Sequence, residues 1–111
     1  MTCNGTMIEK PTLSIADNAD GKRISDLVWD AGFTVEGINW EDIHPYWIVA
    51  RMHGEIVGTI QVLPGKPVGR IEMLAIDRSI RKRYRGTIVM ALLYQALAVL
   101  ELSGSQLASG F

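Results

Sequence analysis

The sequence predicts a mixed α/β domain in which a sheet of short strands has helices packed on its faces. Its 111 residues are the size of one domain, and a hydrophobic content of 48% is enough to bury a core. β-Rich runs and stretches of helical periodicity follow one another in the order β-α-β-β-β-α-β. Because antiparallel hairpins come first and a crossover helix comes last, we expect a central mixed sheet.

The first third of the chain predicts one strand and one helix. Residues 1–11 are polar and are expected to form a flexible leader, so that 12–111 make up a single domain. Residues 12–16 alternate in the manner of a short strand. Apolar residues then recur at helical spacing over 24–31, until Gly32 provides a stop.

Three further strands are predicted in the middle of the chain, at 46–52, 55–63 and 68–76. The first two are β-branched and aromatic and are joined by the turn dipeptide His53-Gly54, which predicts a hairpin. Between the first helix and this hairpin, residues 37–45 are irregular. A charged loop is expected over 77–85.

A long helix is expected to start at Gly86 or Thr87 and to reach about Ser103, with Gly104 placed to end it. Residues 105–111 could begin one more strand. The helix is apolar almost all round between Ile88 and Leu102, which indicates burial on more than one side. We therefore expect a homodimer through this helix or the last strand, unless residues of the N-terminal half close over the helix.

Composition argues against several classes of protein. The chain has 11 Lys and Arg and 12 Asp and Glu, so its net charge of −1 gives no general attraction to nucleic acid or to an anionic membrane. The only cysteine is Cys3, so an intrachain disulfide is impossible and a cytoplasmic setting is expected. The start lacks the pattern of a signal peptide, and the most apolar run is too short to span a bilayer. No His, Cys or Asp grouping has metal-ligand spacing.

Five of the eleven basic residues fall within eight positions, directly after a predicted strand and before the long helix. These are Arg78, Arg81, Lys82, Arg83 and Arg85. A helix N-terminus offers free backbone N–H groups and the positive end of the helix dipole, so cations placed there predict an anion site, most naturally for phosphate. A solvated charged loop is an equally good interpretation of the run alone.

At these residues the sequence resembles the GNAT superfamily of acetyl-CoA-dependent N-acetyltransferases. The similarity to its acetyl-CoA motif lies in Met73-Leu74-Ala75-Ile76-Asp77, followed by Ser79 and by the run from Arg81 to Gly86. The hairpin from Met52 to Gly58 also fits the family pattern. The resemblance extends from about Thr12 to the end of the chain. It implies that acetyl-CoA is the cofactor, held by the backbone of the fourth strand and by the loop before the last helix. The implied contact residues are Leu74, Ala75, Ile76, Arg81, Lys82, Arg83, Tyr84, Arg85, Gly86 and Thr87.

The motif departs from the family pattern at three positions. Arg78 stands where the family often has Pro, Lys82 where Gly is common, and Tyr84 at the first glycine, where a side chain can obstruct a phosphate. A second register, Arg83-x-x-Gly86, restores that glycine but places Ile88 at the last one. Family members generally continue through another helix and two strands, so the resemblance implies a domain that lacks the usual C-terminal helix and strands.

Glu72 is the candidate catalytic residue. Strand alternation predicts that it shares a face with Leu74, from where it could act as general base for an acceptor amine. The alternative is an ion pair with a nearby Arg at a sheet edge, which the sequence favours slightly.

The resemblance implies transfer of an acetyl group from acetyl-CoA to a primary amine, on a small molecule or peptide, by direct attack in a ternary complex. The alternative is a degenerate, non-catalytic GNAT-like binding or interaction module, which Tyr84 favours. Nucleic-acid binding ranks third, because the one basic loop has no interleaved aromatic residue beyond Tyr84 and the rest of the chain is not basic.

Overall fold

A computed structural model describes residues 10–65, 68–104 and 106–107, and the statements below concern these residues. Their strands form one sheet in the order β1-β2-β3-β4-β5, with antiparallel pairs from β1 to β4 and a parallel pair between β4 and β5. The strands are β1 (Thr12–Ile15), β2 (Trp47–Met52), β3 (Glu55–Leu63), β4 (Val68–Ile76) and β5 (Gln106–Leu107). The predicted mixed sheet and element order are confirmed, whereas most of the predicted leader lies outside the described residues.

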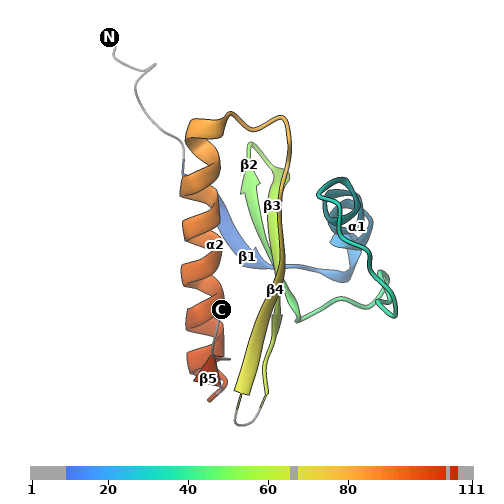
Figure 1. Ribbon diagram of the computed structural model, residues 1–111, viewed down its shortest axis with the longest axis vertical. Coiled ribbons are helices and arrows are strands. Elements are labelled where there is room, and N and C mark those ends of the chain that lie inside the picture. Colours follow the sequence, from blue (N-terminus) through green and yellow to red (C-terminus); the bar gives the residue numbers. More distant parts are fainter. Residues whose placement is uncertain (1–9, 66–67, 105, 108–111) are drawn as a thin grey trace.

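The two helices cover opposite faces of the sheet, which is seen edge-on in Figure 1 with α2 on one side and α1 on the other. Helix α1 (Gly21–Asp30) follows a short 3-10 turn, η2 (Asn18–Asp20), and helix α2 spans Lys82–Leu102. Each face has its own cluster of buried apolar residues. Ile24, Leu27 and Trp47 belong to the α1 face, while Ile60, Ile88 and Leu92 belong to the α2 face.

Helix α2 begins at Lys82, so the predicted start at Gly86 or Thr87 is wrong and the loop after β4 is shorter than expected. Lys, Arg and Tyr continue a helix readily, and a single Gly inside a helix costs only about 1 kcal/mol relative to Ala. Gly86 is exposed and has no neighbour where a Cβ would project, so tertiary packing does not force a break there. The first turn of α2 therefore contains Lys82, Arg83 and Arg85, which the sequence placed in a loop, whereas Arg78 and Arg81 precede the helix.

One stripe of α2 packs against the sheet, and the opposite stripe is exposed. Ile88, Leu92, Ala96 and Leu100 are buried at intervals of four residues. Gly58 in β3 allows this close approach, because a Cβ there would come within 3.2 Å of Ile88 and Leu92 side-chain atoms. By length and apolar composition α2 could cross a membrane, contrary to the prediction that its apolar run is too short. Core helices of soluble proteins pass the same test, and the buried stripe of α2 is part of the core.

A β-bulge interrupts β4 at the residue before Leu74. Thr59 of β3 pairs with Ala75, but Gln61 pairs with Glu72, so two residues of β4 lie opposite one of β3. Met73, within the bulge, has a left-handed φ of 55°. Directly opposed residues share a face, so Glu72 and Gln61 lie on the α1 face, whereas Leu74 packs with the α2-face cluster. The prediction that Glu72 and Leu74 share a face is wrong, because the bulge shifts the alternation between them.

Candidate functional site: the edge of β4 and the start of α2

The outer edge of β4 is unpaired over most of its length within the described residues. Strand β5 pairs only with Val68 and Gly69, at the beginning of β4. Beyond this point a cavity of about 180 Å³ opens between the β4 edge and α2. It is lined by Ile60, Ile71, Glu72, Met73, Leu74 and Leu93. An extended, largely apolar group can lie here beside free backbone of an edge strand.

The cofactor residues that the sequence placed on β4 lie just after the bulge. Leu74 and Ile76 are half-buried and pack with the α2-face cluster, while Ala75 is buried with the α1-face cluster. Their backbone belongs to the same edge as the cavity. From Ile76 the chain runs directly into the loop that leads to α2 (Figure 1).

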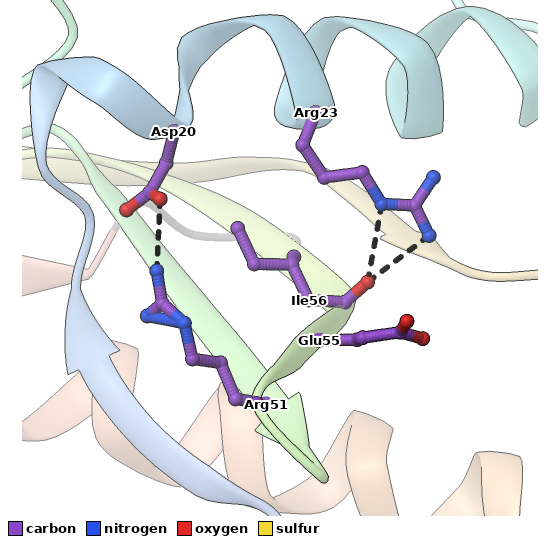
Figure 2. A pocket seen from close by; sticks show the side chains of 6 residues that line it. Asp20, Arg23, Arg51, Glu55 and Ile56 are labelled. Atoms are coloured by element: carbon purple, nitrogen blue, oxygen red, sulfur yellow. Dashed lines mark hydrogen bonds and ion pairs between the residues drawn. The ribbon is translucent and has the colours of Figure 1, made fainter.

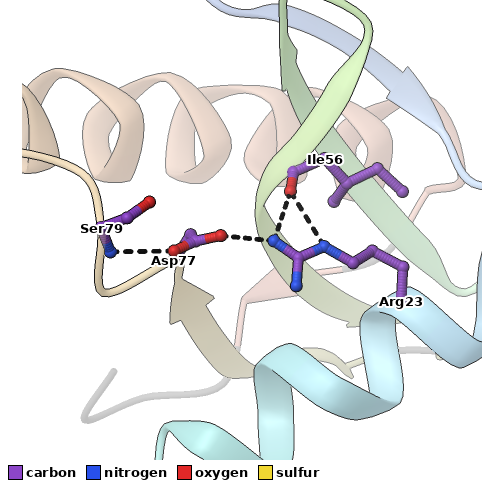
Figure 3. Close-up of polar contacts among 4 residues, drawn as sticks. All are labelled: Arg23, Ile56, Asp77 and Ser79. Carbon is purple, nitrogen blue, oxygen red and sulfur yellow. Dashed lines mark hydrogen bonds and ion pairs between the residues drawn. The ribbon is translucent and has the colours of Figure 1, made fainter.

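Asp77 fixes the start of this loop. Its backbone N–H donates to the Val57 carbonyl at 2.8 Å, and one carboxylate oxygen accepts the Ser79 N–H at 2.8 Å. The other carboxylate oxygen pairs with Arg23 of α1, whose guanidinium also donates to the Ile56 carbonyl at 3.0 Å (Figure 3). These hydrogen bonds, that of the Ser79 N–H above all, lower the pKa of Asp77, although partial burial opposes them. Asp77 therefore stays ionised and holds the loop.

The first turn of α2 presents free donors. The N–H groups of Tyr84 and Arg85 donate to the Arg81 carbonyl, at 2.9 and 3.3 Å. The N–H groups of Lys82 and Arg83 have no acceptor among the described residues, as expected for the first positions of a helix. Arg81, Lys82 and Arg83 also have exposed side chains. Two free N–H groups, three cations and the helix dipole together suit an anion such as a phosphate.

The remaining predicted residues of the motif differ in their surroundings. Arg85 is half-buried and donates to the carbonyls of Ile80 and Arg78, at 2.8 and 2.7 Å, so it shapes the loop from inside. Tyr84 is half-buried, with the Arg83 guanidinium 4.8 Å from its ring centre. Gly86 and Thr87 are exposed in the second turn of α2.

Glu72 forms the ion pair that was one of the two interpretations of this residue. Its carboxylate lies 3.5 Å from the Arg70 guanidinium, and both side chains are substantially exposed, so the pair is weak. Glu72 also lines the cavity at the β4 edge. It is thus an ion-paired residue that borders the region where the chemistry is expected.

Sequence reasoning missed a buried polar residue, Gln61, on the α1 face. Gln61 lines a second cavity of about 180 Å³, closed by the 37–46 loop. The signal was present, because Gln61 interrupts an apolar strand between Ile60 and Val62. A third cavity, of about 410 Å³, lies at the β2–β3 hairpin. Both arginines of its lining are already engaged, Arg51 with the Asp20 carboxylate and Arg23 with the Ile56 carbonyl (Figure 2).

Comparison with known proteins agrees with this architecture. Residues 17–104 match the family model described as Acetyltransferase (GNAT) family. The fold and the β4–α2 loop thus define an acetyltransferase-type α/β domain. The match spans well over half of the sequence, so the chain belongs to the acetyltransferase (GNAT) family. No curated protein matches the sequence.

Solved structures of acetyltransferases share the fold at low sequence identity. Rv2747 from Mycobacterium tuberculosis, in complex with CoA and NLQ, is 21% identical with a TM-score of 0.71; the match covers 86% of this chain and 61% of that one. N-acetylglutamate synthase from Neisseria gonorrhoeae, complexed with coenzyme A and N-acetyl-glutamate, is 16% identical with a TM-score of 0.73. The match covers 91% of this chain and 25% of that one. Diaminobutyrate acetyltransferase from Paenibacillus lautus, with its substrate and coenzyme A, is 19% identical with a TM-score of 0.63. The match covers 79% of this chain and 57% of that one. The chain therefore spans at most about three fifths of these relatives.

Proposed function

We propose that this chain binds acyl-CoA along the β4 edge and uses acetyl-CoA to acetylate a primary amine. The observation that supports this most is the continuity of the site. A free strand edge with an apolar cavity leads, through a loop fixed by Asp77, to a helix N-terminus with free N–H groups and exposed cations. The three solved relatives named above were obtained with coenzyme A, which agrees with this ligand class.

The residues present fit such a cofactor in two parts. The N–H groups of Lys82 and Arg83, with the side chains of Arg81, Lys82 and Arg83, would hold the pyrophosphate. The backbone from Leu74 to Ile76 would hold the pantetheine arm and the thioester oxygen. Acetyl-CoA supplies an activated acetyl group when bound. Arg85 contributes indirectly, because its hydrogen bonds to Ile80 and Arg78 keep the loop in place.

The acceptor must lose a proton before its nitrogen can attack a thioester. Glu72 is the ionisable residue that lines the β4 cavity, so we assign it the role of accepting that proton, directly or through one water. Its pairing with Arg70 leaves the carboxylate accessible, because neither partner is buried. Direct transfer within a ternary complex requires no covalent intermediate on the protein.

A second candidate function is a binding module without catalysis. Tyr84, with Arg83 stacked on its ring, stands where the family motif has its first glycine. If this ring blocks the phosphate site, the Tyr84→Gly variant should bind CoA more tightly than the parent. If the ring is a contact, the variant should bind more weakly, and an unchanged Kd would favour the other register of the motif.

We also propose that the protein is cytoplasmic and forms a homodimer. The exposed stripe of α2 contains Met90, Tyr94 and Leu102, with exposed fractions of 46%, 66% and 89%. An apolar stripe of this kind on a helix favours a protein contact. A two-fold arrangement would cover the stripe of each copy.

Calorimetric titration with acetyl-CoA and with free CoA tests the proposal. We expect saturable binding of both ligands, and release of free thiol when a primary amine is added to the acetyl-CoA complex. Binding without thiol release across a panel of amines would support the non-catalytic module. No binding of either ligand at millimolar concentration would overturn both functions.

A further inference from the structure

Arg23 lies on the α1 face of the sheet, outside the site proposed for acyl-CoA. It belongs to α1, whose inner residues are buried in the α1-face cluster, so the helix that carries it is fixed on the sheet. Its guanidinium donates to the Ile56 carbonyl from Nε at 3.3 Å and from Nη2 at 3.0 Å. The same Nη2 atom donates to the carboxylate of Asp77, the residue directly after β4 (Figure 3). One side chain, held by a helix and a strand, thus reaches the loop before α2.

A short series of contacts leads from Asp77 to the anion site. The Asp77 carboxylate accepts the Ser79 N–H at 2.8 Å, and its carbonyl oxygen accepts the Ile80 N–H at 3.1 Å. Arg81 follows as the N-cap residue of α2, and its carbonyl accepts the N–H groups of the first turn. The free N–H groups of the anion site come directly after it. The position of Asp77 therefore determines where these donors lie.

Arg23 is the stronger of two side-chain links between α1 and this loop. The other is the Arg78–Asp30 pair at 3.3 Å, whose side chains are 76% and 49% exposed, so water competes with it effectively. In the Arg23–Asp77 pair the side chains are 42% and 25% exposed, and the hydrogen bonds to Ile56 orient the guanidinium. Arg85 also holds the loop, but from within α2, so it does not connect the loop to the α1 face.

The placement of the loop matters because hydrogen bonds to an anion depend steeply on distance and direction. Binding groups must be held within about 0.5 Å of their productive positions by contacts outside the site. The loop is largely exposed around Arg78 and Ser79, so its own packing gives little support there. Contacts from the rigid part of the fold have to supply it.

We propose that Arg23 is a positioning residue for the anion site at the start of α2, because through Asp77 it holds the loop in the form that binds pyrophosphate. The inference deepens the proposed function and rests on it for the identity of the anion. It makes the position of α1, on the opposite face of the sheet from α2, a determinant of phosphate affinity. Arg23 itself does not contact the ligand in this account.

The test is an NMR titration of the full chain with inorganic pyrophosphate, followed at the Lys82 and Arg83 amides. Arg23→Gln should raise the Kd at least about fivefold, the lower end of the usual coupling between two sites. Asp77→Ala should also weaken binding, although it removes a negative charge and simple charge attraction predicts the opposite. The double variant should bind no more weakly than the weaker single variant, because both changes break one contact.

Arg51→Gln is the matched control. Arg51 lines the same cavity as Arg23 and has its own ion pair with Asp20, but it makes no hydrogen bond or ion pair with the described residues of the 77–81 loop (Figure 2). The variant removes the same charge as Arg23→Gln does. Pyrophosphate binding that stays at the parent's level in Arg51→Gln would show that the effect of Arg23→Gln is not a general loss of positive charge.

The outcomes separate this inference from the proposed function. An unchanged Kd in Arg23→Gln, stronger binding in Asp77→Ala, additive effects in the double variant, or no pyrophosphate binding by the parent would each overturn the positioning role. A loss of stability in Arg23→Gln with an unchanged Kd would make the residue structural only. If Arg23→Gln fails to fold, the direction of the change in Asp77→Ala decides. A parent that binds pyrophosphate but neither CoA nor acetyl-CoA would overturn the proposed function and leave the positioning role intact.

Discussion

Arg23 in α1 and Asp77, the residue directly after β4, form an ion pair that joins the helix on one sheet face to the loop entering α2. The same guanidinium also holds the Ile56 carbonyl in β3, so one side chain connects three segments that are distant in sequence (Figure 3). Asp77 in turn fixes Ser79. The loop that positions the anion site is thus tied to the rigid part of the fold.

Asp77→Asn should reduce the free energy of unfolding at pH 7 by about 1 kcal/mol, because Arg23 is 42% exposed and such pairs contribute little. The folded-state pKa of Asp77 lies below its ordinary value of 3.8, so its stabilising effect is present above that pH and is lost as pH falls through the folded pKa. The difference between parent and variant, from urea titrations, should therefore be constant from pH 5 to 7 and shrink below pH 3.8. If the difference in unfolding free energy stays constant down to pH 2.5, the ionised form of Asp77 is not what stabilises the fold.

Replacing both Arg81 and Arg83 with Ala should weaken CoA binding at least tenfold, or about 1.4 kcal/mol, because charge-assisted contacts to phosphate are lost. The parent's affinity should fall with added salt and that of the variant should fall less. Arg70→Ala removes an exposed cation at the other end of β4 and is the matched control. If the double variant binds CoA as well as the parent does, the basic run is only a solvated charged surface and not a phosphate site.

Glu72→Gln should lower kcat by about a hundredfold or more, the usual contribution of a general base, and leave the Kd for CoA unchanged. Raising the pH should partly restore the rate, because more of the acceptor amine is then neutral. Arg70→Gln, which removes the ion-pair partner, should retain most of the activity. An active Glu72→Gln variant with the parent's pH profile would assign the proton transfer to another group.

Tyr94→Glu should convert the proposed dimer to a monomer without unfolding it, since Tyr94 is 66% exposed and outside the core. Sedimentation equilibrium at low micromolar concentration distinguishes the two states. Gln95→Glu, an exposed change beside it, is the control and should leave the assembly intact. A parent that sediments as a single 12.3 kDa species would refute the dimer.

The sequence predicted the order of the elements along the chain well, because alternation, turn dipeptides and helical periodicity are local signals. Three features could not be obtained that way. The bulge at Met73 depends on pairing with β3, and it moves Glu72 to the face opposite Leu74. The role of Arg23 depends on a contact across 54 residues. The start of α2 at Lys82 was hidden by Gly86, a local helix breaker that the exposed position tolerates.

The candidate site was predicted only in part, again because the sequence does not show tertiary contacts. The basic run could be placed before a helix from the sequence, but only the structure separates Arg85, bound to loop carbonyls, from the exposed Arg81, Lys82 and Arg83. Gln61 was visible as a polar residue in an apolar strand. That its side-chain oxygen is buried with no hydrogen-bond partner among the described residues needed the packed side chains.

The most direct test of acyl-CoA binding at the β4 edge is an NMR titration of the backbone amides with CoA. The largest saturable shifts are expected at Leu74, Ala75 and Ile76 and at the free N–H groups of Lys82 and Arg83. Saturable shifts confined to other parts of the chain, or no shifts at millimolar CoA, would contradict the account.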